Sequence, residues 1–219
     1  MKTPSALARA AALLLSLPLL AAATPLRAAA EDDYREGRRA YFAGDMAGAS
    51  TLLRKSADLG FAPAQALLGR VLKQTDSVDE ALAYFRKSAA QGYAEAQFEL
   101  GAMYAAGEGV GRDPLEARRW MARAAQAGHR SAIVVMAEAY LGGGLGLAEG
   151  ERSGPAALEW IRLAAEHGHA PALDRLAAAY RNGEMGLAVD ARQARSLEAR
   201  AREARGHKPG AGSSRGLAR

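Results

Sequence analysis

The 219-residue sequence contains no cysteine, and this absence removes several classes of chemistry. Without thiols the chain has no disulfides, no thiolate metal sites, no cysteine nucleophile and no cysteine for an N-terminal lipid anchor. Aromatic residues are scarce, at 6%, although 49% of the chain is hydrophobic. Alanine therefore supplies much of the apolar content, which favours closely packed helices over a sheet.

Acidic residues are missing from the N-terminal segment. The basic residues Lys2 and Arg9 precede an apolar run over 10–23, and three alanines at 28–30 provide small residues for cleavage before Glu31. This order is typical of a secretory signal peptide, and the run is too short for a membrane span. The segment holds three basic residues, so its removal lowers the formal net charge from +5 to +2.

We therefore expect an exported chain, periplasmic or secreted. Residues 1–30 are expected to be cleaved, 31–205 to form the folded domain, and 206–219, which are rich in Gly, Ser and Arg, to form a disordered tail. An uncleaved signal anchor is the alternative, and Pro18 and the alanines before Glu31 argue against it. The nearly balanced mature charge predicts no nucleic-acid partner, and we expect no stable membrane insertion after cleavage.

One spacing of small and aromatic residues recurs along the chain. The best-formed copy, over 81–107, carries it at Ala81, Tyr84, Gly92, Ala96, Gly101 and Tyr104. The same offsets recur from Ala117, from Ala157 and, more weakly, from Ala49. Self-similarity at this period predicts an array of stacked repeats.

The pattern A-x-x-W/Y…A-x-x-G-x-x-x-A-x-x-x-L/A-G/A-x-x-Y resembles the Sel-one-like repeat (SLR) family, a relative of the tetratricopeptide repeat, over about 32–205. The resemblance implies an all-α, right-handed superhelical solenoid of about five antiparallel helix pairs. The first hairpin, with Gly37, Gly44 and Ala49, has the spacing of an ordinary tetratricopeptide unit. Ala194 and Leu197 imitate the repeat out of register in a charged last helix, which is typical of a terminal cap.

Proline and glycine mark the ends of the expected helices. Glycines stand four residues before a helix alanine, where αα-hairpin turns need them, at 60, 92, 128 and 168. Prolines suit first helical turns at 63, 114, 155 and 171. The expected helices are 31–43, 46–59, 63–73, 78–91, 94–106, 114–127, 130–141, 155–167, 171–181 and 190–205.

The repeated residues have a packing role. Gly101 costs about 1 kcal/mol inside a helix relative to alanine, so we expect another group to lie against it. Alanines at 96, 132 and 172 allow paired helices to approach closely. The aromatic residues at 84, 120 and 160 are expected to fill gaps between neighbouring pairs, with those at 104, 140 and 180 one helix away. We interpret them as core rather than a ligand cage.

Two features lie at the turns and loops. The glycine-rich connection 141–155 is the longest between units, and it is either a binding loop or a flexible insertion. His129, His169 and His207 follow hairpin glycines in successive units. Equivalent positions of stacked pairs are at least about 10 Å apart, so these side chains cannot share one metal ion. We expect solvated turn histidines and no metal site.

No catalytic pattern emerges. Residues 212–216 match G-x-S-x-G, but in the tail, without the strand and helix of a nucleophile elbow. The chain lacks S-x-x-K and the cysteine pairs of SLR proteins linked to β-lactam binding. Gly-rich 142–150 lacks the phosphate-loop lysine, and Glu108 and Glu149 fall in loops. We predict a chain that is not an enzyme and has no cofactor.

The resemblance then gives the predicted function: a scaffold that binds another protein or peptide segment on its concave face. The helix that carries the L-G-x-x-Y pattern lines that face in tetratricopeptide arrays. By position, the partner-binding residues are Arg70, Lys73, Glu95, Phe98, Val134, Glu138, Asp174, Arg181 and Asn182. The alternatives are an envelope hydrolase acting on peptidoglycan or a β-lactam, and a periplasmic regulator that sequesters a receptor's outer domain.

Overall fold

The computed structural model describes residues 25–206, and its regular elements there are all helical. The first helix covers 25–42. The others are α2 (Met46–Asp58), α3 (Ala62–Gln74), α4 (Val78–Ala90), α5 (Ala94–Ala106), α6 (Pro114–Gln126), α7 (Arg130–Gly142), the 3-10 helix η1 (Glu149–Ser153), α8 (Pro155–Glu166), α9 (Ala170–Asn182) and α10 (Ala191–Gly206). The ten expected α-helices are thus all present. Most ends agree to within one residue, but the first helix begins before Glu31.

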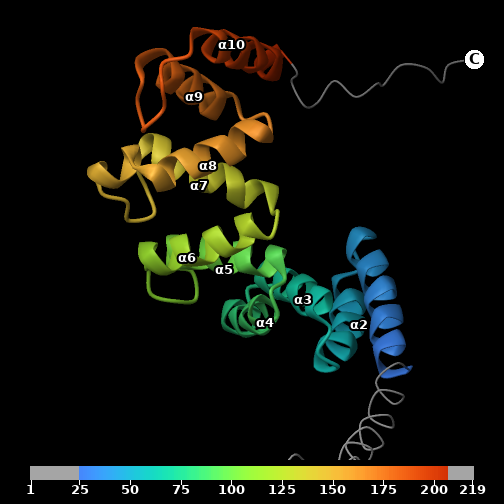
Figure 1. Ribbon diagram of the computed structural model, residues 1–219. Coiled ribbons are helices and arrows are strands. Elements are labelled where there is room, and N and C mark those ends of the chain that lie inside the picture. Colours follow the sequence, from blue (N-terminus) through green and yellow to red (C-terminus); the bar gives the residue numbers. More distant parts are fainter. Residues whose placement is uncertain (1–24, 207–219) are drawn as a thin grey trace, which may run out of the picture. The chain divides into compact units, whose positions relative to one another are not determined.

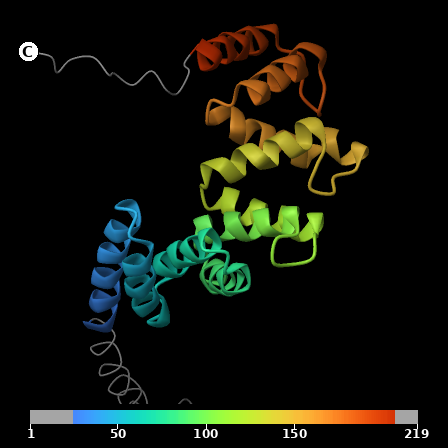
Figure 2. The same ribbon diagram turned by 180° about the vertical axis from the view of Figure 1, so that it is seen from behind.

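The chain divides into two compact units, Met1–Leu100 and Gly101–Arg219, with the boundary inside α5. In the first unit α2 packs on α3 and α3 on α4, and the helix over 25–42 lies beside α2 (Figures 1 and 2). In the second unit each of α6 to α9 packs on the helix that follows it. The helices pack as sequential antiparallel pairs.

The hairpin turns depend on glycine, as predicted. Gly60, Gly92, Gly128 and Gly168 all have φ between +78° and +85°, the left-handed region. At Gly92, for example, the amide N donates to Ala89 O at 3.0 Å and closes the end of α4. A side chain there would be strained although the space around it is open.

Within a pair, a glycine of the first helix faces a large side chain of the second. A Cβ built on Gly101 would lie 3.0 Å from Met121 Cγ and 3.2 Å from Ala117 O. The expectation that a group lies against Gly101 is therefore confirmed. Ala96, Ala132 and Ala172 are completely buried, as their proposed role in close helix approach requires.

The aromatic residues of the repeat are less uniform than predicted. Tyr84 is buried, and its hydroxyl lies 3.3 Å from Arg54 Nη1 and 3.4 Å from Asp58 Oδ1, both in α2. It does connect neighbouring pairs. Trp120 and Trp160 are only half-buried. The guanidinium of Arg123 lies 4.6 Å from the Trp120 ring centroid, an arrangement in which the ring also meets a cation.

The last helix, α10, has a polar outer side and a buried inner side that contacts the preceding helices. Ala194, Leu197 and Ala201 are buried, so the imitation of the repeat does pack. Arg200 Nη2 donates to Ala165 O at 2.9 Å, and Arg205 pairs with Asp174 of α9. These contacts agree with the predicted terminal cap. His207, the G-x-S-x-G match and the expected tail lie outside the described residues, apart from Gly206 at the end of α10.

Candidate functional site

The first helices of the pairs share one register. Ala30, Ala62, Ala94, Arg130 and Ala170 are equivalent, and α3, α5, α7 and α9 each begin at this position. Counted from it, the nine predicted partner-binding residues occupy positions one, four, eight, eleven and twelve. We call the side on which these positions lie in each unit the first-helix face.

The first unit carries a hollow of about 230 Å³ on this face. Three successive first helices line it: the helix over 25–42, α3, and the beginning of α5 with the residue before it. Its apolar lining includes Tyr34, Phe42, Leu67 and Tyr93. Phe42 is 76% exposed, the most exposed large apolar side chain among the described residues. The hollow thus offers aromatic surface to an incoming group.

Charged side chains also line the hollow. The predicted residues Arg70 and Glu95 both line it and form an ion pair between α3 and α5. Arg70 Nη2 also lies 3.6 Å from Glu99 Oε1. Arg38 adds a second guanidinium. Burial raises the pKa of Tyr93 above that of a free phenol, so this hydroxyl stays neutral and available for hydrogen bonding.

In the second unit the predicted residues that carry charge bind other parts of the same chain. His169 Nε2 lies 2.9 Å from Glu138 Oε1, which connects the start of α9 to α7. Arg181 pairs with Glu198 of α10. These contacts hold successive helices together, and each side chain has an internal partner.

Two further predicted residues that are polar also have partners within the chain. Asp174 accepts from Arg205, and Asn182 Nδ2 donates to Glu184 Oε1 at 2.8 Å. Asn182 and then Arg175 lower the pKa of the Glu184 carboxyl by hydrogen bonding. The remaining predicted residues, Lys73, Phe98 and Val134, are half-buried. The predicted set as a whole stays a prediction.

The prediction omitted Tyr34, Arg38, Phe42 and Tyr93. Three of them could have been found, because Tyr34 stands at the register position of Phe98, Arg38 at that of Arg70 and Phe42 at that of Asn182. The prediction assigned the first hairpin to the tetratricopeptide spacing. Its residues were therefore not placed on the register that the other pairs share. Tyr93, which precedes the first position of α5, lies outside the positions that the pattern marks.

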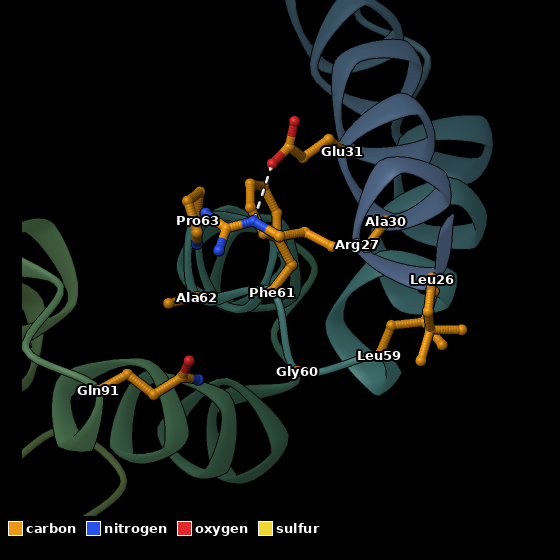
Figure 3. A pocket seen from close by; sticks show the side chains of 10 residues that line it. All are labelled: Leu26, Arg27, Ala30, Glu31, Leu59, Gly60, Phe61, Ala62, Pro63 and Gln91. Atoms are coloured by element: carbon orange, nitrogen blue, oxygen red, sulfur yellow. Dashed lines mark hydrogen bonds and ion pairs between the residues drawn. The ribbon is translucent and has the colours of Figure 1, made fainter. Parts of the chain in front are cut away.

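A second hollow, of about 670 Å³, lies at the turn edge of the first unit (Figure 3). The start of the helix over 25–42 lines one side of it, with Leu26 and Arg27. The α2–α3 turn, including Leu59 and Phe61, lines another. Arg27 Nε donates to Glu31 Oε1 at 3.2 Å across one turn of the helix (Figure 3).

A family model, the Sel1 repeat, matches this chain four times, over residues 62–93, 94–129, 132–169 and 170–202. These segments cover more than half of the sequence, and each begins at or close to the start of a first helix. The chain belongs to the Sel1 repeat family. The predicted family and the predicted fold class, an all-α repeat array of antiparallel helix pairs like those of SLR and tetratricopeptide proteins, are both confirmed.

A solved structure agrees with this assignment. The crystal structure of a Sel1 repeat protein from Oxalobacter formigenes has a TM-score of 0.63 and 25% identity, over 80% of this chain and 73% of that one. The c5321 protein, a protective antigen of uropathogenic Escherichia coli with an SLR fold, is 26% identical, with a TM-score of 0.49, over 80% of this chain and 46% of that one. No curated protein matched.

Sel1 repeats are typically protein-interaction scaffolds, and the family is mostly non-catalytic, although some members are β-lactamases. Within residues 25–206, no group of three or more His, Asp and Glu side chains is arranged to hold a metal ion. Neither Glu108 nor Glu149 lines the two hollows of the first unit. Among the same residues, no helix has the length and apolar character needed to cross a membrane.

The Gly-rich connection between α7 and α8 has more structure than either of its two interpretations assumed. It contains η1, in which Glu151 Oε2 accepts from Ala148 N at 2.9 Å. Arg152 Nη2 donates to Leu141 O at 3.0 Å and satisfies a carbonyl in the last turn of α7. The insertion in this Sel1 repeat is therefore held to α7, the helix that it follows.

Two of the turn histidines make contacts within these repeats. His129 is the N-cap of α7, and its Nδ1 accepts from Ala132 N at 3.2 Å. His169 occupies the same register position before α9, where it contacts Glu138 instead. Both side chains are half-buried and make a structural contact, which the prediction of solvated turn histidines did not include.

Proposed function

We propose that this Sel1 repeat protein is an exported scaffold that binds a segment of another protein on its first-helix face, in the periplasm or cell envelope. The observation that supports it is the hollow lined by Tyr34, Phe42 and Tyr93 beside the Arg70–Glu95 pair. Aromatic residues and arginine are the residue types that dominate binding energy at protein interfaces.

The hollow suits an extended or helical peptide better than a small metabolite. It is shallow, since Phe42 remains 76% exposed, and its lining comes from three helices in succession. A small molecule usually needs a cavity that encloses most of its surface. A side chain of the partner would lie on the rings, and Arg38 and Arg70 would select an acidic neighbour along the bound segment.

Export is the other half of the proposal, and it rests on the N-terminal sequence. The basic residues Lys2 and Arg9 followed by the apolar run 10–23 form the pattern of a secretory signal. Fractionation of the native host, with antibodies against the folded domain, tests this part separately. Recovery of the full-length chain only from the cell interior would contradict it.

The binding test uses a photoreactive phenylalanine analogue in place of Phe42. Leu115 of α6, which is 50% exposed, receives the same analogue as the matched control. After irradiation of intact cells, we expect a discrete cross-linked protein with the analogue at Phe42 and none, or a different set, at Leu115. The adduct should be lost when Tyr34→Ala is added to the Phe42 probe, because that ring lines the same hollow.

A cross-linked product that survives Tyr34→Ala, or that appears equally at both probe positions, would contradict binding in the hollow. Circular dichroism of the Tyr34→Ala variant provides the folding control, because Tyr34 is only half-buried.

A further inference from the structure

We infer that the signal peptide is cleaved after Ala23, seven residues earlier than the site before Glu31, so that the mature chain begins at Thr24. This inference rests on the proposed export. It concerns the segment 25–30, which the first unit uses as part of its fold.

Ala30 is a core residue of the first repeat. It is 2% exposed, and its carbonyl accepts a hydrogen bond of 2.6 Å from the hydroxyl of Ser56 in α2. Ser56 itself is completely buried. Cleavage after Ala30 would remove this carbonyl and leave a buried hydroxyl donor without its acceptor, which proteins generally avoid.

The next repeat contains the same bond. The hydroxyl of Ser88 donates to Ala62 O at 2.8 Å, and Ser88 is also completely buried. Ala30 and Ala62 are equivalent in the register, as are Ser56 and Ser88. Ala30 is thus the first residue of a repeat rather than the last residue of a leader.

A new terminus at Glu31 would not replace the lost acceptor. Its ammonium group is a donor and cannot accept the hydrogen bond from Ser56. The cut would further remove Arg27, which pairs with Glu31, and Leu26, which lines the hollow in Figure 3.

The sequence offers a second cleavage site of the same kind. Ala21, Ala22 and Ala23 end the apolar run over 10–23 and have the small-x-small pattern that the signal peptidase recognises. The chain that remains begins with Thr24 and Pro25. Proline is favoured in the first turn of a helix. This site therefore leaves the whole helix over 25–42 intact.

The test is the N-terminal sequence and intact mass of the full-length chain after export in a bacterial host. We expect the mature protein to begin at Thr24. A mature protein that begins at Glu31 would overturn the inference. Recovery of only the unprocessed chain inside the cell would contradict export itself, so the two failures are distinguishable.

A matched pair of substitutions identifies the site in a second way. The residue three positions before the cut must be small, and it is Ala21 for one site and Ala28 for the other. Ala21→Leu should abolish processing at the first site, and Ala28→Leu should leave it unchanged, since Ala28 is exposed on the helix. The opposite result would assign the cut to the site before Glu31.

The folded state gives an independent measurement. Chains produced without a signal, starting at Thr24 or at Glu31, differ only in the segment under discussion. We expect the shorter chain to melt several degrees lower, because it lacks Ala30 and its bond to Ser56. Ser56→Ala should narrow that difference by removing the stranded hydroxyl. Equal melting temperatures of the two chains would show that 24–30 contribute nothing to the fold and would overturn the inference.

Discussion

The ring of Phe85 in α4 lies directly on Gly69 of α3. A Cβ built on Gly69 would lie 2.9–3.0 Å from three ring carbons, closer than real Cβ contacts allow. Gly37 meets Leu53 and Gly101 meets Met121 in the same way. The distance between the two helices of a pair is therefore set by a missing side chain on one helix and a large one on the other.

Gly69→Ala tests this relationship. Alanine gains about 1 kcal/mol of helix propensity, but overpacking in a core costs about 1–3 kcal/mol. Phe85 is completely buried and has no room to withdraw, so we expect a net loss of about 1 kcal/mol. The free energy of unfolding from urea denaturation measures it.

Gly142→Ala is the matched control, because Gly142 also lies in a helix but has open space around its Cβ position. It should be neutral or slightly stabilising. Adding Phe85→Leu to Gly69→Ala should recover part of the loss. If Gly69→Ala were as well tolerated as Gly142→Ala, the ring contact would not determine the helix spacing.

The pair between Arg54 of α2 and Glu80 of α4 predicts a dependence on pH. The hydrogen bond from Arg54 lowers the pKa of the Glu80 carboxyl below its ordinary value of 4.5. The stabilisation is then fully present above pH 4.5 and is lost as the pH falls through the lowered pKa of the folded state. Both side chains are about 40% exposed, so the contribution is about 0.5 kcal/mol.

We therefore expect Glu80→Gln to lower the free energy of unfolding by about 0.5 kcal/mol at pH 7 and by nothing measurable near pH 3. Glu159→Gln, at an exposed position of α8, is the control. A loss of the same size at both values of pH would mean that the Glu80 charge is irrelevant.

The sequence predicted the helices well because the residues that begin and end them act locally. Glycines with positive φ end the helices and prolines lie in first turns, and both act within a few residues. The start of the first helix was the exception. The segment 25–30 is apolar and alanine-rich, so it satisfied the pattern of a signal peptide and of a helix at the same time.

The site was less predictable for a different reason. Register identifies which positions face one side, but not whether a side chain there has an internal partner. Arg181 and Glu138 stand at positions on this side. However, Arg181 is paired with Glu198, and Glu138 is in contact with His169. These partners come from other helices at separations that the repeat pattern does not encode.

The N-cap role of His129 gives another prediction. Replacing an N-cap acceptor by alanine costs about 1 kcal/mol, and asparagine is a strong substitute. His129→Ala should therefore destabilise the chain by about this amount, and His129→Asn should not. Ser131→Ala, in the exposed first turn of α7, provides the control. Equal losses for the two His129 variants in thermal unfolding would assign the effect to packing rather than capping.

The bond from Arg152 to Leu141 O predicts that this side chain contributes to the order of the inserted loop. A hydrogen bond from a charged donor contributes about 1.5–3 kcal/mol, and partial exposure of Arg152 places it at the lower end. Arg152→Ala should therefore speed amide hydrogen exchange by about tenfold between residues 142 and 154 and leave α9 unchanged. Arg162→Ala, on the exposed side of α8, should change neither region.

The Arg70–Glu95 pair allows its structural and binding roles to be separated by charge exchange. Arg70→Glu alone would bring three carboxylates together, since Glu95 and Glu99 both lie beside Arg70, and we expect a loss of about 1 kcal/mol. The double variant Arg70→Glu with Glu95→Arg restores an attractive pair and should recover most of that stability. Binding of a partner that depends on the orientation of these two charges would still be lost.

The unfolding free energy and the Phe42 cross-link are measured for the unchanged chain, for Arg70→Glu and for the double variant. Together they discriminate between a structural role and a binding role of the pair. If the double variant recovers stability but not cross-linking, the partner recognises the charges of the hollow. The ion pair is then intact, but its charges are exchanged. Recovery of both would mean that Arg70 and Glu95 serve only to join α3 to α5, and the partner would have to be selected by the aromatic lining alone.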